Sequence, residues 1–157
     1  MAVFEYSSRV PAPFGRVWEF HSTIDGLRRL TPGWANLRVE ELRLPADATD
    51  EVLVEGSEID LSVGPLPFGP RQHWTSVITE RVEDESRAYF VDEMRDGPLA
   101  EWRHRHLFEA AGATTIVTDR IAYRTPLGQV ADRAFHGALR LGFRYRHRET
   151  REIVGQA

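Results

Sequence analysis

The spacing of hydrophobic and polar positions near the start of the chain predicts one strand followed by two short helices. Side chains alternate over residues 3–8, which is typical of a strand, and two prolines end this pattern. Apolar side chains then recur every three or four residues over 14–21, which predicts a helix. A second short helix is expected over 24–30, where a Pro-Gly pair ends it.

The middle of the chain has strand-like patterns throughout, separated by short segments rich in turn residues. These patterns predict six strands, over residues 36–43, 51–63, 71–83, 87–95, 99–110 and 113–125. Connections this short imply antiparallel pairing, because a parallel crossover needs a dozen or more residues.

The pattern becomes helical again near residue 127 and predicts a C-terminal helix about twenty-five residues long. The expected buried face of this helix consists of Leu127, Ala131, Ala134, Phe135, Ala138, Leu141, Gly142 and Tyr145. The order of elements predicts an α+β fold, with one long helix laid on a curved antiparallel sheet of about seven strands. The length of 157 residues favours a single domain over 1–157.

Composition narrows the chemistry that the chain can perform. It has no cysteine and no lysine, and all twenty basic residues are arginine. Disulfides, thiolate nucleophiles, cysteine metal sites and lysine Schiff bases are therefore excluded. Histidine, carboxylate and tyrosine groups remain, and they concentrate near residues 89–93, 102–106 and 119–123.

Charge and segment patterns limit the partners. A net charge of −4 argues against a nucleic-acid partner, which normally selects a basic surface. The N-terminus lacks a basic segment followed by an apolar run, and no stretch approaches eighteen apolar residues. We therefore expect a cytoplasmic protein with no nucleic-acid partner and no integral membrane association. The arginines near the C-terminus are expected on a solvated helix face.

Several short phrases carry a family resemblance that extends from Phe4 to about Arg148. They are SRVPAPFGRVWEFH, LTPGW, GPLPF, FVDE, GPLAEWRHRHLFE and TDRIAYRTPLG. The chain resembles the START/polyketide-cyclase-like (SRPBCC) superfamily, and in particular its single-domain bacterial cyclase/dehydrase-like members. This resemblance implies the helix-grip fold, with a deep apolar cavity between the sheet and the C-terminal helix. Superfamily members bind lipids, sterols, quinones, polyketides or plant hormones, and some are cyclases or aromatases.

The segment AEWRHRHLF, residues 100–108, carries the main candidate chemistry. On a strand, Trp102, His104 and His106 share one face, which we assign to the cavity. Folding the next strand back through residues 111–113 places Asp119 opposite His104. A carboxylate would fix the imidazole tautomer, so the pair could act as a catalytic acid–base; it could equally be a satisfied buried pair or orient a ligand.

A metal site is considered and not predicted, and no cofactor is expected. His104 and His106 point the same way, but a third ligand would have to come from Asp119 or Glu93, and neither lies in a recognisable motif. The other four histidines are interpreted as structural or surface residues, with His147 placed in the solvated helix end.

The aromatic side chains carry the binding hypothesis, because they exceed what a turn-rich surface requires. The expected ligand-binding residues are Trp74, Tyr89, Glu93, Trp102, His104, His106, Tyr123, Phe68, Phe135 and Ala138. Phe68 and Leu66 belong to the loop GPLPFGP, which is expected either to cap the pocket mouth or to be a plain hairpin loop. Small residues on the helix fit either a tight helix–sheet contact or a hollow interior.

Three functions follow from these expectations. The first is binding of a hydrophobic small molecule such as a lipid, quinone or polyketide. The second is a cyclase, aromatase or dehydrase that uses His104 and Asp119. The third is a regulatory partner protein with a filled core. The resemblance does not separate them, because one fold hosts many functions, and it leaves open a monomer or a homodimer.

Overall fold

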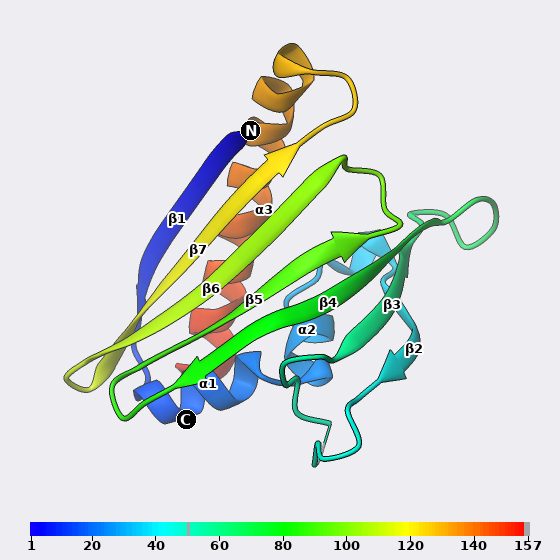
Figure 1. Cartoon of the computed structure of the whole chain (residues 1–157). Helices are drawn as coiled ribbons and strands as arrows, with labels where there is room; N and C mark the ends of the chain where they lie inside the picture. Colours follow the sequence, from blue (N-terminus) through cyan, green and yellow to red (C-terminus); the bar gives the residue numbers. More distant parts are fainter. Residues whose placement is uncertain (50, 156–157) are drawn as a thin grey trace.

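The computed structural model describes residues 1–49 and 51–155, so Asp50 and the last two residues of the expected domain 1–157 lie outside the described residues. Seven antiparallel strands form one curved sheet, and a long C-terminal helix lies across one of its faces (Figure 1). Two short helices follow the first strand. The expected α+β helix-grip architecture is confirmed.

The strands follow one another as a meander, apart from the first. They are β1 (Ala2–Val10), β2 (Arg38–Arg43), β3 (Glu58–Val63), β4 (Gln72–Glu83), β5 (Arg87–Arg95), β6 (Glu101–Ala111) and β7 (Thr114–Arg124). Their order in the sheet is β1-β7-β6-β5-β4-β3-β2, so the first and last strands of the chain pair with each other. Short connections from β4 through β7 give this antiparallel order, as the sequence predicts, whereas residues 44–57 join β2 to β3 by a longer segment.

The β6–β7 hairpin determines which side chains face one another in the candidate site. Its turn consists of residues 112–113, since Ala111 still pairs with Thr114, and lies one position later than the predicted pairing requires, with Gly112 at φ +65°. His106 therefore lies opposite Asp119, and His104 lies opposite Ile121. The predicted pairing of His104 with Asp119 is wrong by two residues. Because a shift of two residues keeps each side chain on its face, both side chains still point to the predicted side.

The expected strand over 51–63 is shorter in the structure, because β3 begins only at Glu58. Gly56 precedes it with φ +91°, a backbone conformation that interrupts a pleated strand. Val52 instead forms an isolated antiparallel bridge with Thr23.

Within the described residues, three α-helices and one 3₁₀ turn complete the fold. They are α1 (Phe14–His21), α2 (Ile24–Arg29), η1 (Gly33–Ala35) and α3 (Gln129–Val154). Thr23 caps α2, since its Oγ1 accepts a hydrogen bond from the Gly26 amide at 3.2 Å. None of the helices that the structure describes is long and apolar enough to cross a membrane.

The buried face of α3 differs from the predicted one. Its buried residues are Leu139, Phe143, His147, Thr150 and Val154. Ala134, Ala138, Leu141 and Gly142, expected to face the sheet, are exposed. The prediction fails because the buried stripe contains polar side chains, which a search for apolar periodicity rejects.

The core is divided into two apolar clusters. The larger lies around Trp18 of α1 and includes Phe108 of β6 and Phe90 of β5. The smaller joins Phe4 of β1 to Phe143 of α3. Helix α3 therefore packs mainly against β1 and β7, at one edge of the sheet.

The close contact between α1 and α2 gives a direct test of the fold. A Cβ added at Gly26 would lie 2.0 Å from the carbonyl oxygen of Phe20, so the helices would have to move apart. We expect Gly26→Ala to lower the free energy of unfolding by about 3 kcal/mol. Gly137 in the interior of α3 has nothing within 4 Å of such a Cβ, so Gly137→Ala should raise it by about 0.5 kcal/mol. Urea unfolding of both variants tests these opposite signs; a neutral Gly26→Ala would contradict the packing.

Candidate functional site

A cavity of about 480 Å³ lies between the sheet and the helices. The inner faces of β3, β4, β5 and β6 line it on one side, and α2 and α3 line it on the other. Most of its wall is apolar, and the charged side chains that reach it are Asp92 and Arg146, together with three histidines, His21, His104 and His106. This volume lies within the range of small-molecule sites.

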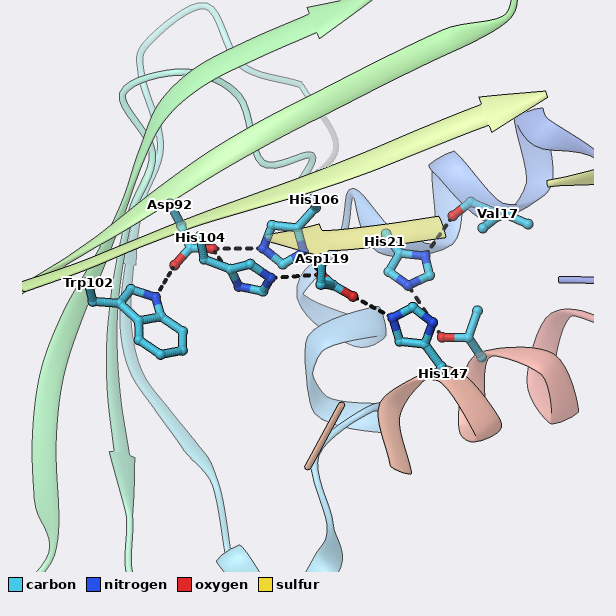
Figure 2. A network of polar contacts seen from close by, with 9 residues as sticks. Val17, His21, Asp92, Trp102, His104, His106, Asp119 and His147 are labelled. Atoms are coloured by element: carbon cyan, nitrogen blue, oxygen red, sulfur yellow. Dashed lines mark hydrogen bonds and ion pairs between the residues drawn. The ribbon is translucent and has the colours of Figure 1, made fainter. Parts of the chain in front are cut away.

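Asp119 of β7 is the centre of a buried polar network at the wall of this cavity (Figure 2). Its Oδ1 accepts a hydrogen bond from His104 Nε2 at 2.7 Å, and its Oδ2 accepts one from His147 Nε2 at 2.6 Å. His106 Nδ1 lies 3.3 Å from Asp119 Oδ1. Ser8 Oγ continues the network, 2.5 Å from His147 Nδ1. The network thus joins β1, β6 and β7 to α3.

Asp92 of β5 binds the same two histidines from the other side. His106 Nε2 donates to Asp92 Oδ2 at 2.8 Å, and His104 Nδ1 lies 3.5 Å from the same oxygen. The indole of Trp102 donates to Asp92 Oδ1 at 3.2 Å. The two imidazole rings, with centroids 3.6 Å apart, therefore lie between two carboxylates.

Both carboxylates are held in the charged form. Burial by itself raises the pKa of Asp119, but hydrogen bonds from His104, His106 and His147 outweigh it and bring the pKa well below its usual range. Burial likewise opposes the charge of Asp92, and the His106 hydrogen bond and the two imidazole charges lower its pKa.

The pKa values of the two neighbouring histidines shift in opposite directions. Burial, followed by the charge of His106, lowers the pKa of His104. Burial also disfavours the charged form of His106, but its hydrogen bonds to Asp119 and Asp92 outweigh burial and raise its pKa. Two rings this close are not easily both positively charged. The histidine pair therefore holds one positive charge, which lies between the negative charges of Asp92 and Asp119.

Arg146 of α3 adds a second positive charge to the cavity wall. Burial lowers its pKa, and the charges of Asp119 and Asp92 oppose that shift. An arginine remains protonated after such a shift, so it balances the second carboxylate. The polar end of the cavity is therefore close to neutral overall.

Five of the side chains predicted to bind a ligand line the cavity. They are Trp74, Trp102, His104, His106 and Phe135. The predicted His104–Asp119 hydrogen bond is present despite the register error.

The other five predicted ligand-binding residues lie outside the cavity wall. Tyr89 stacks with Arg105, and Glu93 pairs with Arg103, both on the opposite face of the sheet. Tyr123 donates to the carbonyl of Asp132, away from the cavity. The remaining two, Phe68 and Ala138, are exposed.

Two of these misplacements have simple physical causes. Phe68, expected to cap the pocket, is 86% exposed, because the loop between β3 and β4 extends away from the body of the protein (Figure 1). Successive residues of a strand point to opposite faces, so Glu93 faces outward while its neighbour Asp92 faces the cavity.

Three side chains of the polar network and the cavity wall are not predicted by the sequence. Asp92 lies one position before the candidate Glu93. His147, expected at a solvated helix end, is 2% exposed and binds Asp119. Arg146, expected on a solvated face, lines the cavity. Arg146 and His147 lie three and four residues after the buried Phe143, so helical spacing from Phe143 could have indicated that both side chains face the interior.

Comparison with known proteins places the chain among proteins of one fold. Residues 10–141 match the family described as polyketide cyclase / dehydrase and lipid transport. A protein from Chromobacterium violaceum superposes with a TM-score of 0.69 at 13% identity, covering 99% of this chain and 98% of its own. A START superfamily protein from Mycobacterium smegmatis has a TM-score of 0.63 at 11% identity, covering 98% and 97%. No curated protein matches the chain in sequence.

The cavity histidine of α1 gives a pH test of the site. His21 Nδ1 donates to the Val17 carbonyl at 2.9 Å, and burial lowers the pKa of His21 from 6.5 to about 3. Below pH 6.5 the unfolded chain therefore binds a proton that the folded chain does not. The free energy of unfolding is therefore not reduced by His21 above pH 6.5, and it falls progressively as the pH decreases from 6.5 toward 3.

We expect wild type to lose about 2 kcal/mol more of its unfolding free energy between pH 7.5 and pH 5 than His21→Asn loses. Asparagine keeps a donor for Val17 and does not titrate. Urea unfolding at the two pH values measures the difference; equal losses would show that folding does not lower the pKa of His21.

Proposed function

We propose that this chain, which belongs to the polyketide cyclase/dehydrase and lipid transport family, binds a hydrophobic small molecule in the cavity between its sheet and α3. The single observation that carries the proposal is a cavity of about 480 Å³ with an apolar wall and polar groups gathered at one part of it. Membership of the family supports a fold that binds hydrophobic ligands. We place this activity in one cytoplasmic domain over 1–157.

The apolar part of the wall fits the body of such a molecule. It includes Leu27, Leu30, Leu53, Ile59, Leu61 and Trp74. Burial of apolar ligand surface here contributes roughly 25 cal/mol per Å² before the cost of association. Lipid-, quinone- or polyketide-like molecules have enough apolar surface for this wall.

The polar part of the wall fits one polar group on the ligand. His104 and His106 reach the cavity with their rings fixed between Asp92 and Asp119. Arg146 brings a guanidinium to the same cavity. A few fixed polar groups in an apolar pocket orient a ligand, so we assign these three side chains to its polar end.

A cyclase- or dehydrase-type enzyme is the second candidate, with His104 as acid–base and Asp119 as its orienting group. The hydrogen bond of 2.7 Å between them favours it. Acid–base catalysis also requires a nitrogen within reach of the substrate. In this chain Nε2 of His104 binds Asp119, and its Nδ1 faces Asp92 at 3.5 Å. Both nitrogens face carboxylates, so we rank binding above catalysis.

Binding of the neutral fluorescent probe N-phenyl-1-naphthylamine tests the proposal. Leu27→Trp adds bulk inside the cavity, whereas Leu141→Trp makes the same change at a position of α3 that is 69% exposed. Because cavity volume is lost only in the first variant, we expect its probe affinity to fall about tenfold and that of the second to stay within about twofold of wild type.

Thermal unfolding of both variants verifies that they are folded before the titration. Native mass spectrometry of the purified wild type gives a second measurement, with a co-purified apolar molecule expected. Equal probe affinities in the three proteins, together with no co-purified molecule, would reject the proposal.

A further inference from the structure

Three donor atoms converge at the cavity wall from two neighbouring strands. Asp92 Oδ2 lies 2.8 Å from His106 Nε2 and 3.5 Å from His104 Nδ1. Each of the three residues offers one ligand atom within 4.8 Å of those of the other two. Two ligands about 2.0–2.2 Å from one tetrahedral ion are about 3.3–3.6 Å apart, so the separations of 2.8 and 3.5 Å from Asp92 Oδ2 are close to what an ion needs. The donor set contains two nitrogens and one carboxylate oxygen.

The remaining polar atoms of these three side chains already have partners. Asp92 Oδ1 accepts a hydrogen bond from Trp102, so Oδ2 is the oxygen left for an ion. His104 Nε2 donates to Asp119, and His106 Nδ1 lies 3.3 Å from the same carboxylate. A carboxylate behind each imidazole is the arrangement that orients metal-binding histidines and strengthens them as ligands.

We propose that Asp92, His104 and His106 bind one divalent transition-metal ion at the cavity wall, through Asp92 Oδ2, His104 Nδ1 and His106 Nε2. The ion takes the place of the hydrogen bond between His106 and Asp92, and the proton on His106 Nε2 is released to solvent. His106 then carries its proton on Nδ1, toward Asp119. Imidazole nitrogens with one carboxylate favour zinc, cobalt or iron over magnesium and calcium, which prefer oxygen ligands.

The surroundings of the site suit an ion that also contacts a small molecule. All three ligands line the cavity, whereas Asp119 and His147 lie behind them. Three protein ligands leave at least one coordination position of a zinc or cobalt ion open, and it would face the cavity. The ion would therefore give the polar end of the cavity a point that binds an oxygen or nitrogen atom.

The sequence does not predict this site, because the candidates that it offers for a third ligand are Glu93 and Asp119. Glu93 lies on the outer face with Arg103, and Asp119 is behind the rings. Asp92 supplies the missing oxygen. The inference does not depend on the proposed function, since metal binding is measured without any hydrophobic ligand.

The test is titration of the untagged full chain with Co²⁺, followed through its visible d–d absorption, and with Zn²⁺ by calorimetry. One ion per chain is expected, with no comparable heat from Mg²⁺. Asp92→Asn should weaken Zn²⁺ affinity about 100-fold, and Asp119→Asn about tenfold, since Asp119 acts through the histidines. Glu93→Gln, on the outer face of the sheet, and His136→Gln, on α3 beside Phe4, change no ligand atom and should match wild type.

A measurement on wild type guards against variants that fail to fold. In spectra of ¹⁵N-histidine-labelled protein, Zn²⁺ should shift the Nδ1 resonance of one imidazole and the Nε2 resonance of another, assigned to His104 and His106. Absence of a Co²⁺ band, or Zn²⁺ shifts only at other histidines, would overturn the proposal. If the metal proposal is overturned in this way, binding of N-phenyl-1-naphthylamine by the same metal-free sample would still support the proposed hydrophobic ligand site.

Discussion

The buried carboxylate of Asp119 is the constraint on which the rest of the structure depends. A carboxylate that is 4% exposed costs several kcal/mol of desolvation unless hydrogen bonds replace its water. Three imidazoles, from β6 and α3, supply them. The strand pairing and the position of the helix must therefore satisfy the same two oxygen atoms. A polar requirement, in addition to apolar burial, fixes how the helix meets the sheet.

This requirement also explains why a cavity can persist beside a long helix. His147 binds Asp119 of β7, while Phe143 packs with Phe4 of β1, so α3 is held near one edge of the sheet. The inner faces of β3, β4 and β5 lie farther along the sheet and line the cavity. A helix anchored by apolar contacts alone could slide toward these strands and fill the space, because apolar attraction has no direction.

The sequence predicts the strands and helices well because alternation and helical spacing are local properties. It predicts the face of β6 correctly but not its pairing, since the register depends on the exact turn at Gly112. It also misplaces the face of α3, because the buried stripe contains His147 and Thr150. Asp92 could not be found at all from its own strand. Its partners lie on β6, and only the paired sheet brings them together.

His104 and His106 link this architecture to the cavity because both rings are held in place. His106 stacks on Phe90, with ring centroids 4.1 Å apart, and Phe143 meets His104 edge-on at 5.2 Å. Hydrogen bonds to carboxylates orient the ring nitrogens, and contacts with Phe90 and Phe143 hold the ring planes. Each imidazole therefore has little conformational entropy to lose on binding. A molecule or ion that binds at this wall pays little for ordering the protein side chains. The interactions that stabilise the fold therefore also prepare the polar end of the cavity for binding.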